Sequence, residues 1–98
     1  MSQEAASAYE FRRKIDDVVY RFEPCETRFQ NKAWKRNNLD VWIVYLPNIG
    51  WCTVDAFDTV NGLPWNLPLS AQSNLPPTGE WVSKKLNKSY VYDLVRIP

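Results

Sequence analysis

The chain has 98 residues, which fits one domain with a core of its own. It contains no histidine and two cysteines, so a Ser-His-Asp triad, a Cys-His pair and histidine-containing or four-cysteine zinc sites are excluded. The 12 basic and 11 acidic residues give a formal net charge of +1, which argues against a generalist nucleic-acid binder. Five tryptophans favour a binding protein over an enzyme, because tryptophan is enriched at binding hot spots.

The sequence indicates a cytoplasmic protein. Residues 1–8 lack the basic and apolar regions of a secretory signal. The longest apolar run, Val41 to Leu46, has six residues, far below the roughly 20 that span a bilayer. Cys25 and Cys52 lie 27 positions apart in a chain without a signal, which favours two reduced thiols over a disulfide. We therefore expect a soluble protein of the cytoplasm with no membrane partner.

The N-terminal part predicts helices. Residues 2–23 carry an apolar stripe at three- and four-residue steps, formed by Ala8, Phe11, Ile15, Val18, Val19 and Phe22. Ser2 is a candidate N-cap, and Pro24 would end this helix. The alternative is a strand from Val18 to Glu23, since Val-Val-Tyr-Arg-Phe is rich in strand formers. A shorter second helix is expected over 26–36, with Phe29 and Ala33 facing the core.

A β-hairpin is expected over residues 40–57. Its first strand runs from Val41 to Leu46 and its second from Trp51 to Phe57. The intervening Pro-Asn-Ile-Gly supplies turn chemistry, because proline presets φ and glycine permits a positive φ. The first strand is apolar on both faces, which indicates a central strand or a surface covered by a partner.

Residues 59–79 form a stretch without a charged side chain that holds four of the seven prolines. Proline this dense disfavours both helix and strand, so a long loop is expected. Residues 80–98 then return to order, with a strand from Tyr90 to Ile97. The expected fold is a single α+β domain, 1–98. It has a mainly helical part (1–38), the hairpin (40–57), the proline-rich loop (59–79) and a C-terminal strand region (80–98). The N-terminal helices are expected to pack on a small antiparallel sheet.

No constellation of residues predicts catalysis. Asp16 and Asp17 would point to different helix faces, and the spacing of Asp55 and Asp58 defines no geometry for acid–base work. Cys52 lies in the stretch 37–83, which contains no Lys or Arg, so no nearby cation in sequence would activate the thiol. We expect no enzyme and no catalytic, cofactor-binding or metal-binding residue.

Two sets of residues are candidates for binding a partner. The first is a basic helical face formed by Arg28, Lys32, Lys35 and Arg36. Such a face suits binding of phosphate or of an acidic protein surface. The alternative is a solvated helix face without a binding role. The second lies in the proline-rich loop and comprises Leu63, Pro64, Trp65, Leu67, Pro68 and Leu69. A proline-rich segment loses less conformational entropy on docking, and Trp65 is an anchor of hot-spot type. The alternative is that the loop wraps the domain's own sheet, with Trp65 filling a gap in the core.

The remaining tryptophans, Trp34, Trp42, Trp51 and Trp81, lie within or beside predicted elements and are expected to be packing residues. The Leu67–Pro68 bond is one of four X-Pro bonds in the loop, and exchange at such bonds makes Pro68 a candidate substrate for a host prolyl isomerase.

The chain resembles the small anti-RecBCD proteins of Salmonella lambdoid phages. The resemblance is carried by the chain length, the lack of a signal or cofactor motif, and the uncharged segment GLPWNLPLS at 62–70. It implies a non-catalytic protein, made in the cytoplasm of an infected bacterium, that binds the host RecBCD helicase–nuclease through RecC. Binding would change how RecBCD processes DNA ends and so protect phage DNA. The alternative from the residues is a small nucleic-acid-binding module that uses the basic helix face.

Overall fold

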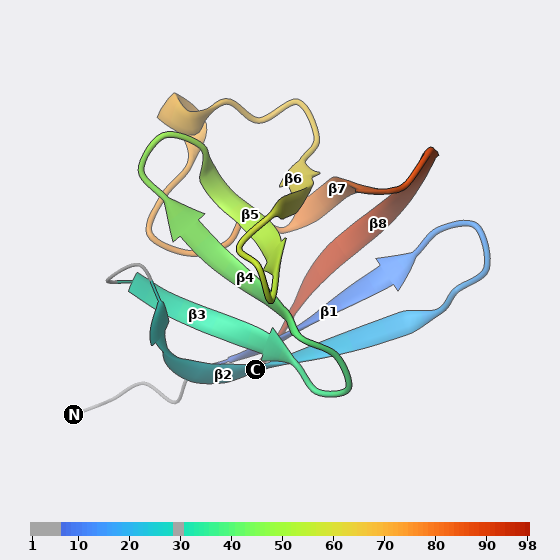
Figure 1. The fold of residues 1–98 in the computed structure, drawn as a ribbon, viewed down its shortest axis with the longest axis horizontal. Helices are drawn as coiled ribbons and strands as arrows, with labels where there is room; N and C mark the ends of the chain where they lie inside the picture. The colour runs from blue at the N-terminus through green and yellow to red at the C-terminus, as the bar shows by residue number, and fades with distance from the viewer. Residues whose placement is uncertain (1–6, 29–30) are drawn as a thin grey trace.

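The computed structural model describes residues 7–28 and 31–98, and over these the chain forms a closed barrel of eight antiparallel strands (Figure 1). Each strand pairs with the next along the chain, and β8 returns to pair with β1. The strands are β1 (Ala8–Arg13), β2 (Val19–Arg28), β3 (Asn31–Arg36), β4 (Val41–Leu46), β5 (Gly50–Asp55), β6 (Val60–Pro64), β7 (Gly79–Lys85) and β8 (Lys88–Ile97). The described ranges contain no α-helix, so the predicted α+β fold is wrong.

The predicted helix over 2–23 is an antiparallel pair of strands over its described part. Tyr9 pairs with Phe22 and Phe11 with Tyr20, which places these aromatic rings on the inner face of the barrel. The strands turn at 14–18, where Ile15 is 82% exposed although the helical stripe assigned it to the core. The alternative strand from Val18 to Glu23 is confirmed from Val19 onward, as the first half of β2, while Val18 belongs to the turn.

The predicted helix over 26–36 is also wrong, because its described residues belong to β2 and β3. The chain does not end an element at Pro24, which lies within β2 opposite Trp34. Ala33 is buried as predicted, but on a strand, while Phe29 lies outside the described residues. The "mainly helical" part of the chain is therefore three strands of the barrel wall.

The predicted hairpin over 40–57 is confirmed as β4 and β5. Leu46 pairs with Gly50, and Gly50 has a φ of +92°, which a glycine adopts readily. Both faces of this hairpin are buried. Ile43 and Trp51 face the barrel interior, while Val44, Cys52 and Val54 form a second buried cluster with Ala33. The two-sided apolar pattern of the first strand thus reflects packing on both faces.

Aromatic rings fill most of the barrel interior. The buried residues there are Tyr9, Phe11, Phe22, Trp34, Ile43, Trp51, Trp81, Tyr92 and Leu94. Most of these ring pairs meet edge to face, with centroids 5.0 Å apart for Tyr9 and Trp34 and 5.2 Å apart for Phe11 and Trp81, while Phe11 and Tyr92 are tilted. Such pairs contribute beyond the area that they bury. Trp34, Trp51 and Trp81 are buried and Trp42 is half-buried, which confirms the expectation that these four are packing residues.

A bulge in β6 brings a polar pair into the barrel wall. Thr53 pairs with Gly62 and Val54 with Val60, so Asn61 is the extra residue on β6. The Thr53 hydroxyl donates to Asn61 Oδ1 over 2.6 Å. A Cβ on Gly62 would lie 2.3 Å from Thr53 Oγ1, so this close approach requires glycine.

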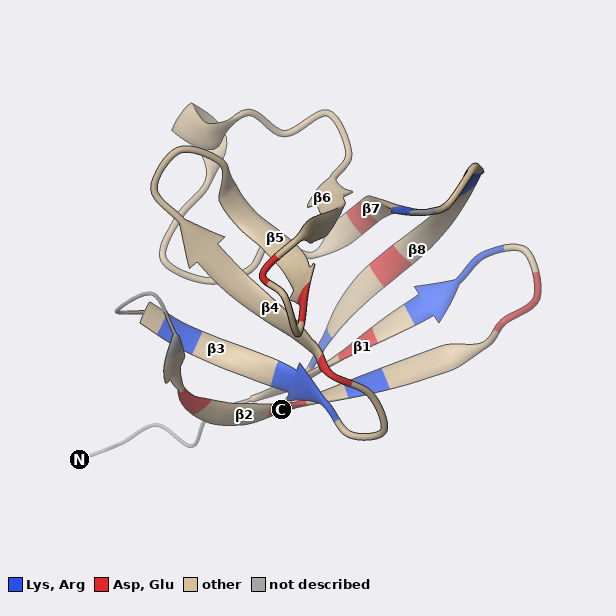
Figure 2. Ribbon diagram, viewed as in Figure 1, with Lys and Arg blue, Asp and Glu red and all other residues tan. Residues whose placement is uncertain are grey.

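The two ends of the barrel differ. Because successive strands alternate in direction, the turns at 14–18, 37–40, 56–59 and 86–87 share one end, and the connections at 47–49 and 65–78 share the other. The long connection 65–78 lies against the β4–β5 turn (Figure 1). The stretch from β4 to the start of β7 carries no Lys or Arg, so basic residues gather on β1–β3, β7 and β8 (Figure 2). No helix in the described ranges is long and apolar enough to cross a membrane.

Candidate functional site

The proline-rich connection is shorter and more ordered than predicted. Of the predicted loop 59–79, residues 60–64 belong to β6 and Gly79 begins β7, which leaves 65–78 as the connection. Pro64 is the last residue of β6, and the contact with β7 continues past it through the Trp65 N–H, which donates to the Glu80 carbonyl over 2.8 Å. A single 3₁₀ turn, Leu69–Ala71, follows Pro68.

Buried side chains of the barrel fasten this connection to the barrel end. Gln72 Oε1 accepts the Trp51 N–H over 2.8 Å, and Gln72 Nε2 donates to the Leu67 carbonyl over 3.2 Å. The indole of Trp51 donates to the Ser73 carbonyl over 3.0 Å, and that of Trp81 donates to the Pro77 carbonyl over 2.8 Å. The connection therefore uses polar atoms of two core tryptophans as anchors, although it has little regular structure.

The connection has one side packed on the barrel and one side facing outward. Leu75 packs against the interior cluster and Pro76 is buried, so part of the segment does wrap the domain's own sheet. Trp65, however, is 62% exposed and fills no gap in the core. Its backbone N–H is held by the Glu80 carbonyl over 2.8 Å, which fixes the base of the side chain.

The apolar residues close to Trp65 in sequence differ in their exposure. Leu63 and Leu69 are also exposed, Pro68 is exposed, and Pro64 and Leu67 are half-buried. A hollow of about 440 Å³ runs beside the indole, lined by Val60, Asn61, Gly62, Leu63, Pro64, Trp65, Asn66, Val82 and Lys84. We call Leu63, Pro64, Trp65 and this hollow the Trp65 surface. Of the six loop residues singled out from the sequence, Leu63, Pro64 and Trp65 line this hollow, whereas Leu67, Pro68 and Leu69 do not.

The four predicted basic residues do not share a helical face. Strand geometry puts Lys35 and Arg36 on opposite faces of β3, because side chains alternate with a period of two. Lys35 lies on the outside, 3.5 Å from Asp40 and over the ring of Trp42, whereas Arg36 lines the barrel interior. Lys32 is exposed near the other end of β3, and Arg28 ends β2, although its side chain lies outside the described part.

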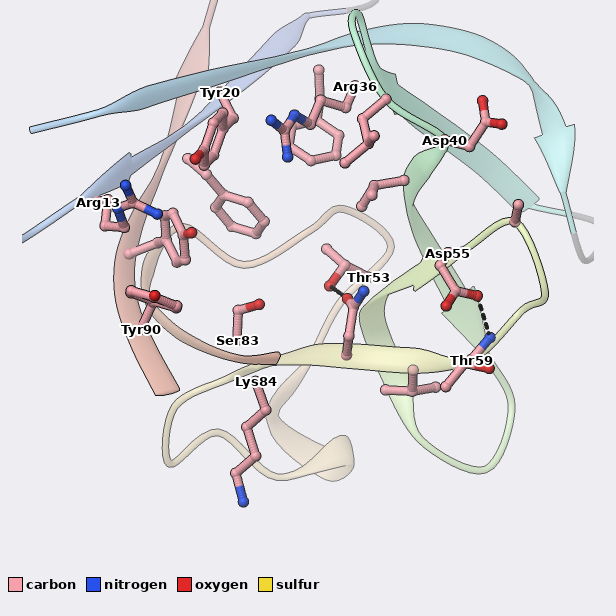
Figure 3. A pocket seen from close by; sticks show the side chains of 18 of the residues that line it. Arg13, Tyr20, Arg36, Asp40, Thr53, Asp55, Thr59, Ser83, Lys84 and Tyr90 are labelled. Carbon is pink, nitrogen blue, oxygen red and sulfur yellow. Dashed lines mark hydrogen bonds between the residues drawn. The ribbon is translucent and has the colours of Figure 1, made fainter. Parts of the chain in front are cut away.

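The end of the barrel opposite the proline-rich connection contains a cavity that sequence reasoning did not find (Figure 3). It has a volume of about 690 Å³ and is lined from all eight strands as well as from the turns. We call it the mouth cavity. Phe11, Phe22 and Tyr92 of the interior cluster form its apolar part. Arg13, Tyr20, Arg36 and Tyr90 line one wall (Figure 3).

The arginines of this wall are stacked on tyrosine rings. Arg36 Cζ lies 3.7 Å from the centre of the Tyr20 ring, and Arg13 Cζ lies 4.9 Å from that of Tyr90. Arg13 is also bound by both carboxylate oxygens of Asp16, at 2.9 and 2.8 Å. Hydrogen bonding to Asp16 raises the pKa of Arg13, and the same bond lowers the pKa of Asp16. Burial raises the pKa of Tyr92, while its hydrogen bond from Arg13 opposes that shift.

Acidic groups near the mouth are held by other partners. Asp55 Oδ1 accepts the N–H groups of Phe57 and Thr59, at 2.9 and 3.0 Å, and so closes the turn between β5 and β6. Asp40 is paired with Lys35. Over the described ranges, no group of three His, Cys, Asp or Glu side chains could hold a metal ion. Burial raises the pKa of the Cys52 thiol to about 11, so this thiol is a poor nucleophile near neutral pH.

Comparisons with protein-family models, with curated proteins and with solved structures found no match to this chain.

Proposed function

We propose that this chain is a non-catalytic binding protein that recognises a host protein through the Trp65 surface. The observation that carries the proposal is a large indole that is 62% exposed on an anchored backbone, beside a hollow. An exposed apolar aromatic group is most effective in binding when its base is already fixed, because less conformational freedom is lost on docking. Four hydrogen bonds that involve Gln72, Trp51 and Trp81 hold the connection that begins at Trp65.

The partner that we propose is the RecC subunit of host RecBCD. This identity comes from the resemblance of the chain to small anti-RecBCD proteins of phages, carried by segment 62–70. That segment supplies most of the Trp65 surface, so the resemblance and the exposed indole point to the same residues. Binding there would modulate the nuclease and recombination activity of RecBCD and protect phage DNA in the cytoplasm of the infected bacterium.

The test is binding of the purified chain to immobilised RecBCD by biolayer interferometry. Trp65→Ala should weaken binding by roughly 30-fold, the effect of losing about 2 kcal/mol at a hot spot. Phe57→Ala is the matched control, because Phe57 is an aromatic residue that is 87% exposed in the turn at the opposite end of the barrel. Absence of binding by the wild-type chain, or equal losses for the two variants, would contradict the proposal.

A nucleic-acid-binding function gains less support from the arrangement of the cations. It requires several basic groups on one surface, but β3 turns Arg36 inward and Lys35 outward, where Asp40 pairs with it. Steeply salt-dependent binding of DNA or RNA that Lys32→Glu abolishes and Trp65→Ala leaves intact would favour that function instead.

We also propose that a host prolyl isomerase acts on the Leu67–Pro68 bond. Pro68 is exposed and precedes the 3₁₀ turn on the outward side of the connection, so an enzyme can reach it without opening the barrel. Adding a cyclophilin-type isomerase to the labelled chain should broaden or merge the amide signals of residues 66–70 in NMR spectra. A single set of sharp signals that the isomerase leaves unchanged would refute this part of the proposal.

A further inference from the structure

The mouth cavity has the size and lining of a small-molecule site. Its volume of about 690 Å³ falls within the roughly 300–1,000 Å³ typical of ligand pockets. Its apolar part comes from buried aromatic rings of the interior, and polar groups at Thr53, Asn61 and Ser83 lie beside them (Figure 3). The cavity opens at the end of the barrel opposite Trp65, and it shares Val60, Asn61 and Lys84 with the hollow beside that indole.

Among the charged groups that line the cavity, Arg36 is the candidate for binding an anion. The carboxylates of Asp40 and Asp55 are engaged by Lys35 and by two backbone N–H groups, and Arg13 is engaged by Asp16. Lys84 points away from the cavity (Figure 3). Arg36 differs from these groups. Its Nε donates to Asn38 Oδ1 over 2.8 Å, but within the described ranges no ion pair involves its guanidinium.

The geometry of Arg36 favours a carboxylate. Its guanidinium is held over the Tyr20 ring, with Cζ 3.7 Å from the ring centre, and by the Asn38 bond, so its position is set before a ligand arrives. With Nε engaged, the terminal Nη groups remain for a planar two-oxygen acceptor, which the guanidinium fork matches. The neighbouring rings of Tyr20, Tyr90 and Tyr92 offer faces and edges to an aromatic body attached to that carboxylate.

We propose that the mouth cavity binds a small aromatic carboxylate, with its carboxylate on Arg36 and its ring among the tyrosines. The probe is 2-naphthoate, titrated into the ¹⁵N-labelled full chain and followed by NMR and by calorimetry. Saturable shifts are expected at the amides of Thr53 and Ser83. The uncharged analogue 2-naphthamide should bind at least about tenfold more weakly, and inorganic phosphate, which lacks the ring, should be similarly weak.

Two variants test whether Arg36 binds the carboxylate of the ligand. Arg36→Gln should weaken 2-naphthoate about tenfold while leaving 2-naphthamide unchanged, which also shows that the cavity is intact. Arg12→Gln is the matched control, because Arg12 lies on the outer face beside Glu10, and this variant should bind 2-naphthoate like the wild type. Equal affinity of the wild type for the acid and the amide overturns the proposal even if Arg36→Gln fails to fold. Equal effects of the two variants, or shifts centred on Trp65, would overturn it as well.

Discussion

Gln72 is expected to stabilise both the barrel end and the proline-rich connection, and Gln72→Ala tests this. Its side chain accepts the N–H of Trp51, a residue that is 2% exposed, and donates to the Leu67 carbonyl. A buried N–H left without a partner costs about 1–3 kcal/mol, and a typical further hydrogen bond contributes about 0.5–1.5 kcal/mol. We expect the free energy of unfolding to fall by about 2–3 kcal/mol, a large part of the about 5–15 kcal/mol that stabilises most domains.

The assay is urea unfolding followed by tryptophan fluorescence, with amide hydrogen exchange of Trp51 as a local readout. A loss of this size in a chain of 98 residues corresponds to a fall in Tm of roughly 10–20 °C. Ser70→Ala is the matched control, because Ser70 is exposed on the same connection. A change below about 0.5 kcal/mol with Trp51 exchange unaltered would refute the reasoning, since surface substitutions alone reach that value.

Three further predictions concern the barrel wall. Gly62→Ala should lower the free energy of unfolding by about 1–3 kcal/mol, because the added Cβ would lie 2.3 Å from Thr53 Oγ1. If that contact is the cause, urea unfolding should show a much smaller loss when the same substitution is made in a Thr53→Ala background. Asp55→Ala should cost about 1–2 kcal/mol in thermal unfolding, since two backbone N–H groups lose their acceptor; an unchanged Tm would contradict this. The free energy of unfolding should fall as pH rises from 9 to about 11, because the Cys52 thiol ionises in the unfolded chain but not when buried. Cys52→Ala should remove that part of the pH dependence. Mass spectrometry after treatment with iodoacetamide at pH 8 should show that exposed Cys25 is modified before Cys52.

The N-terminal strands were missed because their apolar positions fit two periods. Phe11, Ile15, Val18 and Phe22 are spaced as on a helix, yet Phe11 and Phe22 face the interior from two strands joined by a turn. The alternation expected of strands is broken where Arg13 and Arg36 point inward to the mouth cavity. Because residues that line the cavity interrupt the alternation of apolar and polar positions, the sequence pattern did not indicate these strands.

Other features were local and could be predicted. The hairpin of β4 and β5 follows from a turn sequence between two apolar runs, and Trp65 differs from the other tryptophans because its neighbours are prolines and uncharged residues. The mouth cavity is assembled from residues as distant as Arg13 and Tyr90, which meet only once the barrel has closed. No short stretch of the sequence carries that information.

The pairing of β1 with β8 also has a consequence for how the chain folds. Ala8 lies opposite Ile97, so closing the barrel joins positions 89 residues apart. Closing so large a loop costs conformational entropy before the pairing of β1 with β8 forms any contact. We therefore expect this chain to fold slowly, as other all-β topologies do. Without β8, the edges of β1 and β7 would both lack their partner strand. Truncation within β8 should therefore yield an aggregation-prone chain in place of a smaller folded one.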